Sequence, residues 1–242
     1  MLALARNAAG HPDARVLQLA DWIRANPAPD GRWNQRRLVI FTQWEATRFW
    51  LQRRLLELLD DLTPDDRIAP FTGVTPPDRR EDLKRRFNAD PDEDKLRILL
   101  CTDAAREGIN LQARCSDLFH FDLPWNPAVL EQRNGRIDRK LQPAPEVHCR
   151  YFVYAQRSED VVLEALARKT ELIREQLGSV GQVLADRLSD CLERHGIVTA
   201  ATLAQEIEDE ADDLSRWRGG EHRPTPRAPA LVHRLQRLSV AT

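Results

Sequence analysis

Cysteine is scarce in this sequence, and its spacing matches no common cysteine-based site. The 242 residues include four cysteines and no Cys-x-x-Cys pair, which excludes the usual zinc and thioredoxin-like motifs. Three of the four lie in apolar stretches, so we expect small buried core residues, no disulfide framework and no metal site. Such usage is typical of a reducing, cytoplasmic setting. The four are Cys101, Cys115, Cys149 and Cys191.

Long apolar runs and an excess of one charge are absent as well. No stretch is long and apolar enough to cross a membrane, and the N-terminus lacks a signal-peptide pattern. The net charge is −2 at pH 7, so any contact with nucleic acid must come from a local surface rather than from overall charge. With 42% hydrophobic residues, the chain can form one well-packed domain with additional elements.

The sequence also lacks a phosphate loop. No Gly-x-x-x-x-Gly-Lys-Ser/Thr segment occurs, and this loop is what cradles the β- and γ-phosphates of a nucleotide and places Mg²⁺. The acidic run Asp92–Lys95 resembles a helicase acidic box, but it precedes an apolar strand instead of following one. We therefore interpret it as a charged turn, and we expect any ATPase site to need a second domain.

Short apolar runs alternate with helical patterns as far as Tyr154. This alternation predicts an α/β fold, a parallel sheet with helices on both faces, in which ligands bind beyond the carboxyl ends of the strands. The predicted strands are Leu38–Thr42, Arg67–Phe71, Leu96–Thr102, Leu118–Phe121 and Val147–Tyr154. The predicted helices are Asp13–Ala25, Glu45–Leu59, Pro77–Phe87 and Pro127–Leu141.

The composition divides the chain into four predicted regions. Residues 1–35 form an N-terminal helix and loop, and residues 36–156 form the α/β lobe. Residues 157–217 carry helical patterns bounded by Ser158 and several glycines, and we expect them to brace the lobe. Residues 218–242 are rich in Arg and Pro, which predicts a weakly ordered tail or a docking segment.

The most informative segment is Gln132–Gln142, within the last predicted helix of the lobe. Helical spacing would place Gln132, Gly135, Arg136 and Arg139 on one face. Two guanidinium groups there would suit a polyphosphate, because arginine offers a planar fork of donors and keeps its charge. The alternative is an ordinary solvated face, since exposed charges of this kind often have no specific role.

Three further segments follow the predicted strands: Leu38–Trp44, Phe71–Thr75 and Leu99–Gln112. Together with Gln132–Gln142, their order and spacing resemble the second RecA-like lobe of superfamily 2 helicases. The resemblance is strongest to the SNF2 group and, within it, to the bacterial RapA/HepA-like type. It covers about Arg36–Tyr154 and implies a RecA-like parallel sheet followed by an α-helical C-terminal extension.

The resemblance implies roles for individual residues. Arg136 and Arg139 match the arginines that reach ATP bound on the other lobe, where they would neutralise charge on the γ-phosphoryl group. Gln132 matches a residue that supports that helix and the nucleotide, and Gly108 and Asn110 match residues near the nucleotide. Residues matching nucleic-acid contacts, mostly to the sugar–phosphate backbone, are Thr42, Gln43, Thr72, Gly73, Thr102 and Asp103.

The chain also departs from the eukaryotic remodellers of this group, which typically have His at Asp138 and Gly at Leu141. Their fifth motif is glycine-rich where this chain has Asp103–Glu107. These departures disfavour nucleosome remodelling and are tolerated in the bacterial relatives. RNA polymerase and phage-defence proteins are accordingly the partners that the resemblance suggests, without a choice between them.

The leading hypothesis is the second motor lobe of an ATP-dependent translocase on double-stranded DNA. It would use ATP with Mg²⁺ held mainly by the missing first lobe, and would be inactive alone. One alternative is a non-catalytic module that docks protein or nucleic acid. Another is a DEAD-box-like RNA helicase lobe, although Asn110 and the run Phe121–Asn126 favour SNF2.

Other aromatic and basic residues have simpler interpretations. We expect three tryptophans to pack in the core or at the lobe edge rather than to stack on bases: Trp44, Trp50 and Trp125. We expect the arginines of two helices to be solvated, with a share near the DNA path: Arg53, Arg54, Arg79, Arg80, Arg85 and Arg86.

Overall fold

The computed structural model describes residues 13–62, 64–103, 110–124, 127–139, 142–154 and 232–239. The chain forms two compact units. The first contains residues 1–122, 134–152 and 232–242, and the second contains residues 123–133 and 153–231. The predicted helices after Ser158, the residues Gly108 and Trp125, and the stretch 218–231 lie outside the described residues.

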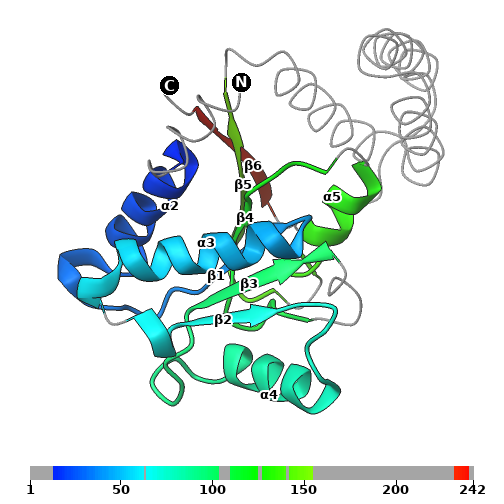
Figure 1. Cartoon of the computed structure of the whole chain (residues 1–242). Helices are drawn as coiled ribbons and strands as arrows, with labels where there is room; N and C mark the ends of the chain where they lie inside the picture. Colours follow the sequence, from blue (N-terminus) through cyan, green and yellow to red (C-terminus); the bar gives the residue numbers. More distant parts are fainter. Residues whose placement is uncertain are drawn as a thin grey trace, which may run out of the picture. The chain divides into compact units, whose positions relative to one another are not determined.

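A six-stranded sheet, in the order β2-β3-β1-β4-β5-β6, forms the centre of the first unit (Figure 1). Its first five strands run parallel to their neighbours. Each was predicted to within two residues at either end, which confirms the parallel α/β fold. The strands are β1 (Leu38–Thr42), β2 (Ile68–Phe71), β3 (Ile98–Thr102), β4 (Asp117–His120), β5 (Glu146–Val153) and β6 (Val232–Ser239).

The runs that form β1, β3 and β4 are buried at every position, as expected of strands covered on both faces. Two helical connections cover these strands, one on each face of the sheet. The chain passes from β1 over β3 to β2 through α3 (Glu45–Leu58), and returns to β3 through α4 (Pro77–Asn88). Because such crossovers are right-handed, the reversal of direction places α3 and α4 on opposite faces, as Figure 1 shows for β2 and β3.

Each of these helices begins at a residue that the sequence marks. In α2 (Ala14–Ala25), the Asp13 side chain accepts a hydrogen bond of 2.8 Å from the N–H of Arg15. Helix α4 starts at Pro77, where a missing N–H costs nothing. The buried residues follow helical spacing, with Leu51 and Leu55 in α3 and Leu83 and Phe87 in α4. The predicted helices of this unit are therefore confirmed to within one residue.

Helix α5 (Pro127–Asn134) begins at Pro127 as predicted but ends well before the predicted Leu141. After Asn134 the chain turns, and the carbonyl of Asn134 accepts hydrogen bonds from the N–H groups of Ile137 (3.1 Å) and Asp138 (3.0 Å). Gly135 is a poor helix former at that point, and the turn closes there instead. The prediction of a single helix through Arg139 is therefore wrong.

The C-terminal segment also differs from its prediction. The stretch Val232–Ser239 is strand β6, next to β5 at the edge of the sheet. The sequence had suggested a weakly ordered tail or docking segment there, because Arg and Pro dominate the surrounding composition. Its apolar residues, Val232, Leu235 and Leu238, recur every third position, so the alternation typical of a strand is absent and its pairing with β5 was not signalled locally. The predicted burial of the cysteines is confirmed for Cys101, Cys115 and Cys149, and Cys191 lies outside the described residues.

Buried arginines fill the amino edge of the sheet, where the strands begin. The carboxylate of Asp117, at the start of β4, is fully buried and pairs with Arg36 (2.5 Å) and Arg150 (2.6 Å). The Trp22 ring of α2 lies against both guanidinium groups, 5.2 and 4.8 Å from its centroid. Arg97, also buried, donates to the carbonyls of Asn34, Pro91, Asp94 and Leu96.

Candidate functional site

The predicted nucleic-acid contacts lie together at the carboxyl edge of the sheet. Strands β2, β3 and β1 are consecutive neighbours in the sheet. Thr42 pairs in register with Thr102, and Phe71 pairs with Cys101, so Thr72 lies beside the end of β3. The carboxyl ends of these three strands, with the described residues that follow them directly, therefore form one rim about 10 Å across.

The loop after β1 is fixed by Asp122, a residue to which the sequence analysis gave no role. The Asp122 carboxylate accepts a hydrogen bond from the Thr42 hydroxyl and another of 2.9 Å from the N–H of Gln43. Thr42 is 1% exposed, whereas Gln43 is exposed. Of this pair, Gln43 is consequently the residue presented to a ligand, and Thr42 holds the loop in place.

The loop after β2 is fixed by Arg80 from the first turns of α4. The Arg80 guanidinium donates to the carbonyls of Thr75 (2.9 Å), Thr72 (3.1 Å) and Gly73 (2.6 Å). The N–H of Thr72 donates to the Thr75 hydroxyl at 2.9 Å. The expectation that Arg80 is solvated is wrong, because it closes this loop. Gly73 is exposed and Thr72 is buried, so Gly73 is the predicted contact that this loop presents.

Four of the predicted site residues lie at the end of β3 or in the chain that follows it. Thr102 is buried and Asp103 is half-buried, while Asn110 is exposed and Gly108 lies outside the described residues. The side-chain amide of Asn88, in the last turn of α4, donates to the carbonyl of Asn110 at 2.8 Å. The next residue, Leu111, donates its N–H to the carbonyl of Arg136 at 3.1 Å. The backbone beside the predicted nucleotide residue thus contacts the arginine segment directly.

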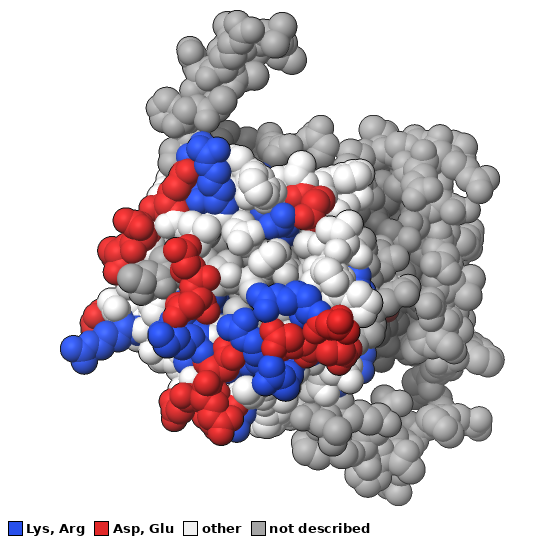
Figure 2. Space-filling view, turned by 60° about the horizontal axis from the view of Figure 1, so that its bottom comes forward, with Lys and Arg blue, Asp and Glu red and all other residues white. Residues whose placement is uncertain are grey.

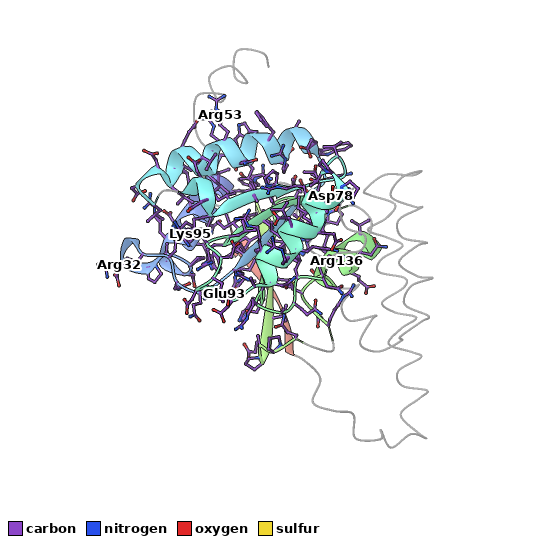
Figure 3. All side chains as sticks on the ribbon, turned by 90° about the horizontal axis from the view of Figure 1, so that it is seen from below. Arg32, Arg53, Asp78, Glu93, Lys95 and Arg136 are labelled. Carbon is purple, nitrogen blue, oxygen red and sulfur yellow. The ribbon has the colours of Figure 1, made fainter. Side chains whose placement is uncertain are left out.

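The two predicted arginine fingers lie on the turn after α5, which we call the arginine turn (residues 135–139). Arg136 is half-buried and Arg139 is exposed, and Arg139 donates from Nε to the carbonyl of Gly135 at 2.9 Å. Figure 3 shows Arg136 on the same side of the first unit as Asp78, at the start of α4, and away from Lys95 and Arg32. The structure therefore places Arg136 toward the end of the unit where β2 leads into α4.

Gln132 is exposed and belongs to α5 in the second unit. The shared helical face predicted for Gln132, Arg136 and Arg139 does not form, because the helix ends between them. The local signal for this ending was present in the sequence as Asn134-Gly135, a pair that commonly ends helices.

Ion pairs neutralise much of the basic surface on α3 and α4. Arg53 and Arg54 pair with Glu57, and hydrogen bonds from both hold the pKa of the Glu57 carboxyl below its ordinary value. On α4, Arg79 and Arg85 share Asp82. Figure 2 shows Lys and Arg side chains alternating with Asp and Glu on the face turned to the viewer. These helices accordingly present mixed charge rather than a basic track.

The exposed apolar side chains near the rim contrast with this mixed charge. Trp44, directly after Gln43, is 63% exposed, and Val74, directly after Gly73, is 84% exposed. Of the two placements predicted for Trp44, the core or the lobe edge, the core is wrong. Trp50 follows the expectation, since its ring lies 6.3 Å from that of Phe121. Apolar side chains exposed beside polar loops commonly mark a surface that meets a partner.

The described part of the chain shows neither a metal-binding cluster nor a membrane-spanning helix. It contains no group of three His, Cys, Asp or Glu side chains placed to hold a metal ion. None of its helices combines the length and apolar character that crossing a bilayer requires.

Comparison with known proteins agrees with this geometry. The family described as helicase conserved C-terminal domain matches residues 31–140. The "Uncharacterized ATP-dependent helicase YqhH" of Bacillus subtilis (strain 168) is 30% identical over 207 residues, covering 85% of this chain and 33% of the relative. The "RNA polymerase-associated protein RapA" of Yersinia enterocolitica is 52% identical over 127 residues, covering 52% of this chain and 12% of the relative.

Two further likenesses are shorter or weaker. The "Defense against restriction protein B" of Escherichia phage P1 is 35% identical over 94 residues, which is 39% of this chain and 4% of that protein. Among solved structures, the C-terminal part of the Fun30 ATPase domain matches with a TM-score of 0.48 and 20% identity, over 74% of this chain and 52% of that one. This chain spans a third or less of the curated relatives named here. Residues 31–140 match the helicase conserved C-terminal domain, and the chain is similar to the C-terminal lobe of SNF2-like helicases.

Proposed function

We propose that this chain is the second motor lobe of an ATP-dependent translocase that moves along double-stranded DNA. In this proposal a first lobe binds ATP and Mg²⁺, and this lobe completes the ATPase site with Arg136 and Arg139. Closure of the two lobes on ATP and their reopening after hydrolysis would move the duplex stepwise.

One observation carries the proposal. The Thr42, Thr72 and Thr102 ends of three adjacent parallel strands form one rim, and the backbone after the third strand is bonded to Arg136. A ligand on the rim and a nucleotide near Arg136 would therefore contact parts of one rigid assembly. That arrangement suits a protein that links nucleic-acid binding to phosphoryl transfer.

The character of the rim supports nucleic-acid backbone as its ligand. Gln43 and Gly73 are exposed on loops that Asp122 and Arg80 already hold in place, so binding would cost little ordering free energy. Uncharged side-chain and backbone donors of this kind position a sugar–phosphate chain without selecting a sequence. Duplex DNA is favoured over RNA by the likeness to the SNF2-like group, and RNA polymerase or phage-defence proteins would be partners of the whole protein.

The nucleotide part of the proposal depends on the arginines alone. The described residues provide no cluster for Mg²⁺, so the metal would be held by the first lobe. Arg136 and Arg139 would stabilise the negative charge that develops on the γ-phosphoryl oxygens. Mg²⁺ bound by the first lobe would share in neutralising that charge.

The test is duplex-stimulated ATP hydrolysis by a polypeptide that carries this lobe and its first lobe. Arg136→Ala should lower kcat by about 10³-fold or more, as loss of an arginine finger does, with little change in the Kd for duplex. Arg53→Ala, which removes an exposed arginine paired with Glu57, is the matched control and should leave kcat unchanged.

The isolated chain gives the second arm of the test. We expect it to hydrolyse no ATP above background, with or without DNA. Turnover by the isolated chain that disappears in Arg136→Ala would overturn the proposed division of labour between lobes. Stimulation by RNA but not by duplex DNA would instead favour an RNA helicase lobe.

A further inference from the structure

A buried amide lies directly behind the arginine turn. Gln142 is 9% exposed, and its side-chain nitrogen donates to the carbonyl of Ile137 at 2.8 Å and to the carbonyl of Cys115 at 2.9 Å. Its side-chain oxygen accepts from the N–H of Ala144 at 3.1 Å. Its backbone N–H donates to the carbonyl of Arg139 at 2.9 Å. One residue therefore makes four hydrogen bonds, two of them to the arginine turn.

The group at the other end of this bridge is itself well anchored. Cys115 is 1% exposed, and its thiol donates to the carbonyls of Arg37 (3.4 Å) and Asp117 (3.3 Å). Asp117 is the fully buried carboxylate that pairs with Arg36 and Arg150. The Gln142 amide thus connects the arginine turn to the buried backbone of Cys115, just before β4.

No other natural side chain reproduces this bridge. The side chain must donate two hydrogen bonds from one nitrogen, to the carbonyls of Ile137 and Cys115. It must also accept a hydrogen bond from the N–H of Ala144 through an oxygen on the same carbon. Only a side-chain amide has both groups. Asparagine is one methylene shorter. Glutamate at neutral pH would face two carbonyl oxygens with no proton to donate. The identity of residue 142 is therefore determined by hydrogen bonding rather than by volume.

The bonds hold the arginine turn from one side, and Leu111 holds it from another through the 3.1 Å bond to the carbonyl of Arg136. We propose that Gln142 is a positioning residue for phosphoryl transfer, which fixes the backbone of Arg136 and Arg139 so that their guanidinium groups meet the nucleotide. This inference depends on the proposed function of those arginines. A displacement of about 1 Å in such a group can reduce a rate by about 10²-fold.

The experiment compares variants in the polypeptide that carries both lobes. Gln142→Met keeps the length of the side chain and removes the donors. It should lower kcat by about tenfold or more, and change the KM for ATP and the Kd for duplex by less than about twofold. Asn26→Asp is the matched control: it removes an amide that donates to the carbonyl of Trp22 at 3.0 Å, far along the chain from the arginine turn, and should leave kcat unchanged.

A double-mutant cycle separates positioning from general stability. If Gln142 acts through Arg136 and Arg139, Gln142→Met should cause no further loss of kcat in a background that carries both Arg136→Ala and Arg139→Ala. An equal fold loss in both backgrounds, or an unchanged kcat in Gln142→Met alone, would overturn the inference while leaving the proposed function intact. An unchanged kcat in Arg136→Ala alone would overturn the proposed function itself.

A second variant applies if Gln142→Met does not fold. In Gln142→Glu, burial raises the pKa of the new carboxyl, and its protonated form regains one O–H donor. The kcat of this variant should recover at least in part between about pH 8 and about pH 6, whereas the wild type should show no such rise. Absence of that recovery in the folded variant would also contradict the inference.

Discussion

The two edges of the sheet use their polar side chains differently. At the amino edge, Arg36 and Arg150 are committed to the buried carboxylate of Asp117, and Arg97 is committed to backbone carbonyls. At the carboxyl edge, Asp122 and Arg80 form hydrogen bonds with loop atoms, and these loops carry the exposed residues Gln43 and Gly73. Charge therefore stabilises the fold at one edge, and the other edge keeps preordered loops available for a ligand.

Burial shifts the pKa values of two side chains at the amino edge, Arg37 and Cys115. Arg37, directly before β1, is 1% exposed, and it donates to the carbonyls of Phe87 and Ala89. Burial, together with nearby Arg97, lowers the pKa of its guanidinium to about 10. Burial also raises the pKa of the Cys115 thiol above its ordinary value.

The largest expected effect tests the amino edge. Asp117→Asn should lower the free energy of unfolding by about 3–5 kcal/mol, because it leaves the buried Arg150 without its countercharge. Urea unfolding followed by circular dichroism would measure this. Arg53→Ala, which breaks an exposed pair, is the control and should have no measurable effect. A small loss in Asp117→Asn would mean that the aromatic rings around Arg150, rather than the carboxylate, stabilise it.

The corresponding change at the carboxyl edge should cost less. Asp122→Ala removes the acceptor for the Thr42 hydroxyl and the Gln43 N–H, and should lower the free energy of unfolding by about 1–2 kcal/mol. The loop should also lose protection, so hydrogen exchange at Gln43 should accelerate. A loss as large as that of Asp117→Asn would contradict the distinction between the two edges.

A smaller, pH-dependent effect is expected at Asp94, between α4 and β3. Burial raises the pKa of this carboxyl, but hydrogen bonds from Arg86 and the N–H of Leu96 outweigh it, so the pKa lies below its ordinary value. The stabilisation is present above the unfolded-state pKa of about 4 and is lost as the pH falls through the lower folded-state pKa. Asp94→Asn should therefore unfold more easily at neutral pH and show a weaker fall in stability below about pH 4. Urea unfolding of both proteins across this pH range measures the difference. Equal free energies of unfolding at every pH would show that the Arg86–Asp94 pair does not stabilise the fold.

The smallest effect is expected for Trp44. With a side chain 63% exposed, Trp44→Ala should change the free energy of unfolding by no more than about 0.5 kcal/mol. Trp22→Ala should cost several times as much, because its ring packs 4.9 Å from Phe119 and against the guanidinium groups of Arg36, which is half-buried, and Arg150, which is buried. Comparable losses for the two tryptophans would show that the carboxyl edge also depends on its aromatic residue for stability.

Much of the fold could be predicted from local patterns, because buried parallel strands are continuous apolar runs and the intervening helices have clear starts. The ends of β1, β2 and β3 were predictable for the same reason, and with them the rim that carries Gln43 and Gly73. What holds the rim was not predictable. Asp122 bonds to the loop after β1, which is distant in sequence, and Arg80 bonds to the loop that precedes its own helix. No spacing rule identifies such hydrogen-bond partners.

The arginine turn illustrates a second limit of sequence reasoning. Helical periodicity continued past Asn134 in the sequence, but hydrogen bonds from Ile137 and Asp138 back to Asn134 close a turn there. The residue that secures this turn, Gln142, is the last residue of the segment Gln132–Gln142, but no pattern in the sequence indicated that its side chain would bond back to the turn. Strand β6 was missed because its apolar positions are surrounded by arginine and proline, and because its partner β5 is separated from it by most of the second unit.

That long-range pairing affects the order in which the protein can fold. Strands β1 to β5 come from one continuous stretch of about a hundred residues, and their contacts can form while synthesis proceeds. Strand β6 must close a loop that contains most of the second unit, which is slow compared with local pairing. Until it arrives, β5 has unpaired N–H and C=O groups along one side, and a nascent or truncated chain that ends before Val232 would be prone to self-association through that edge.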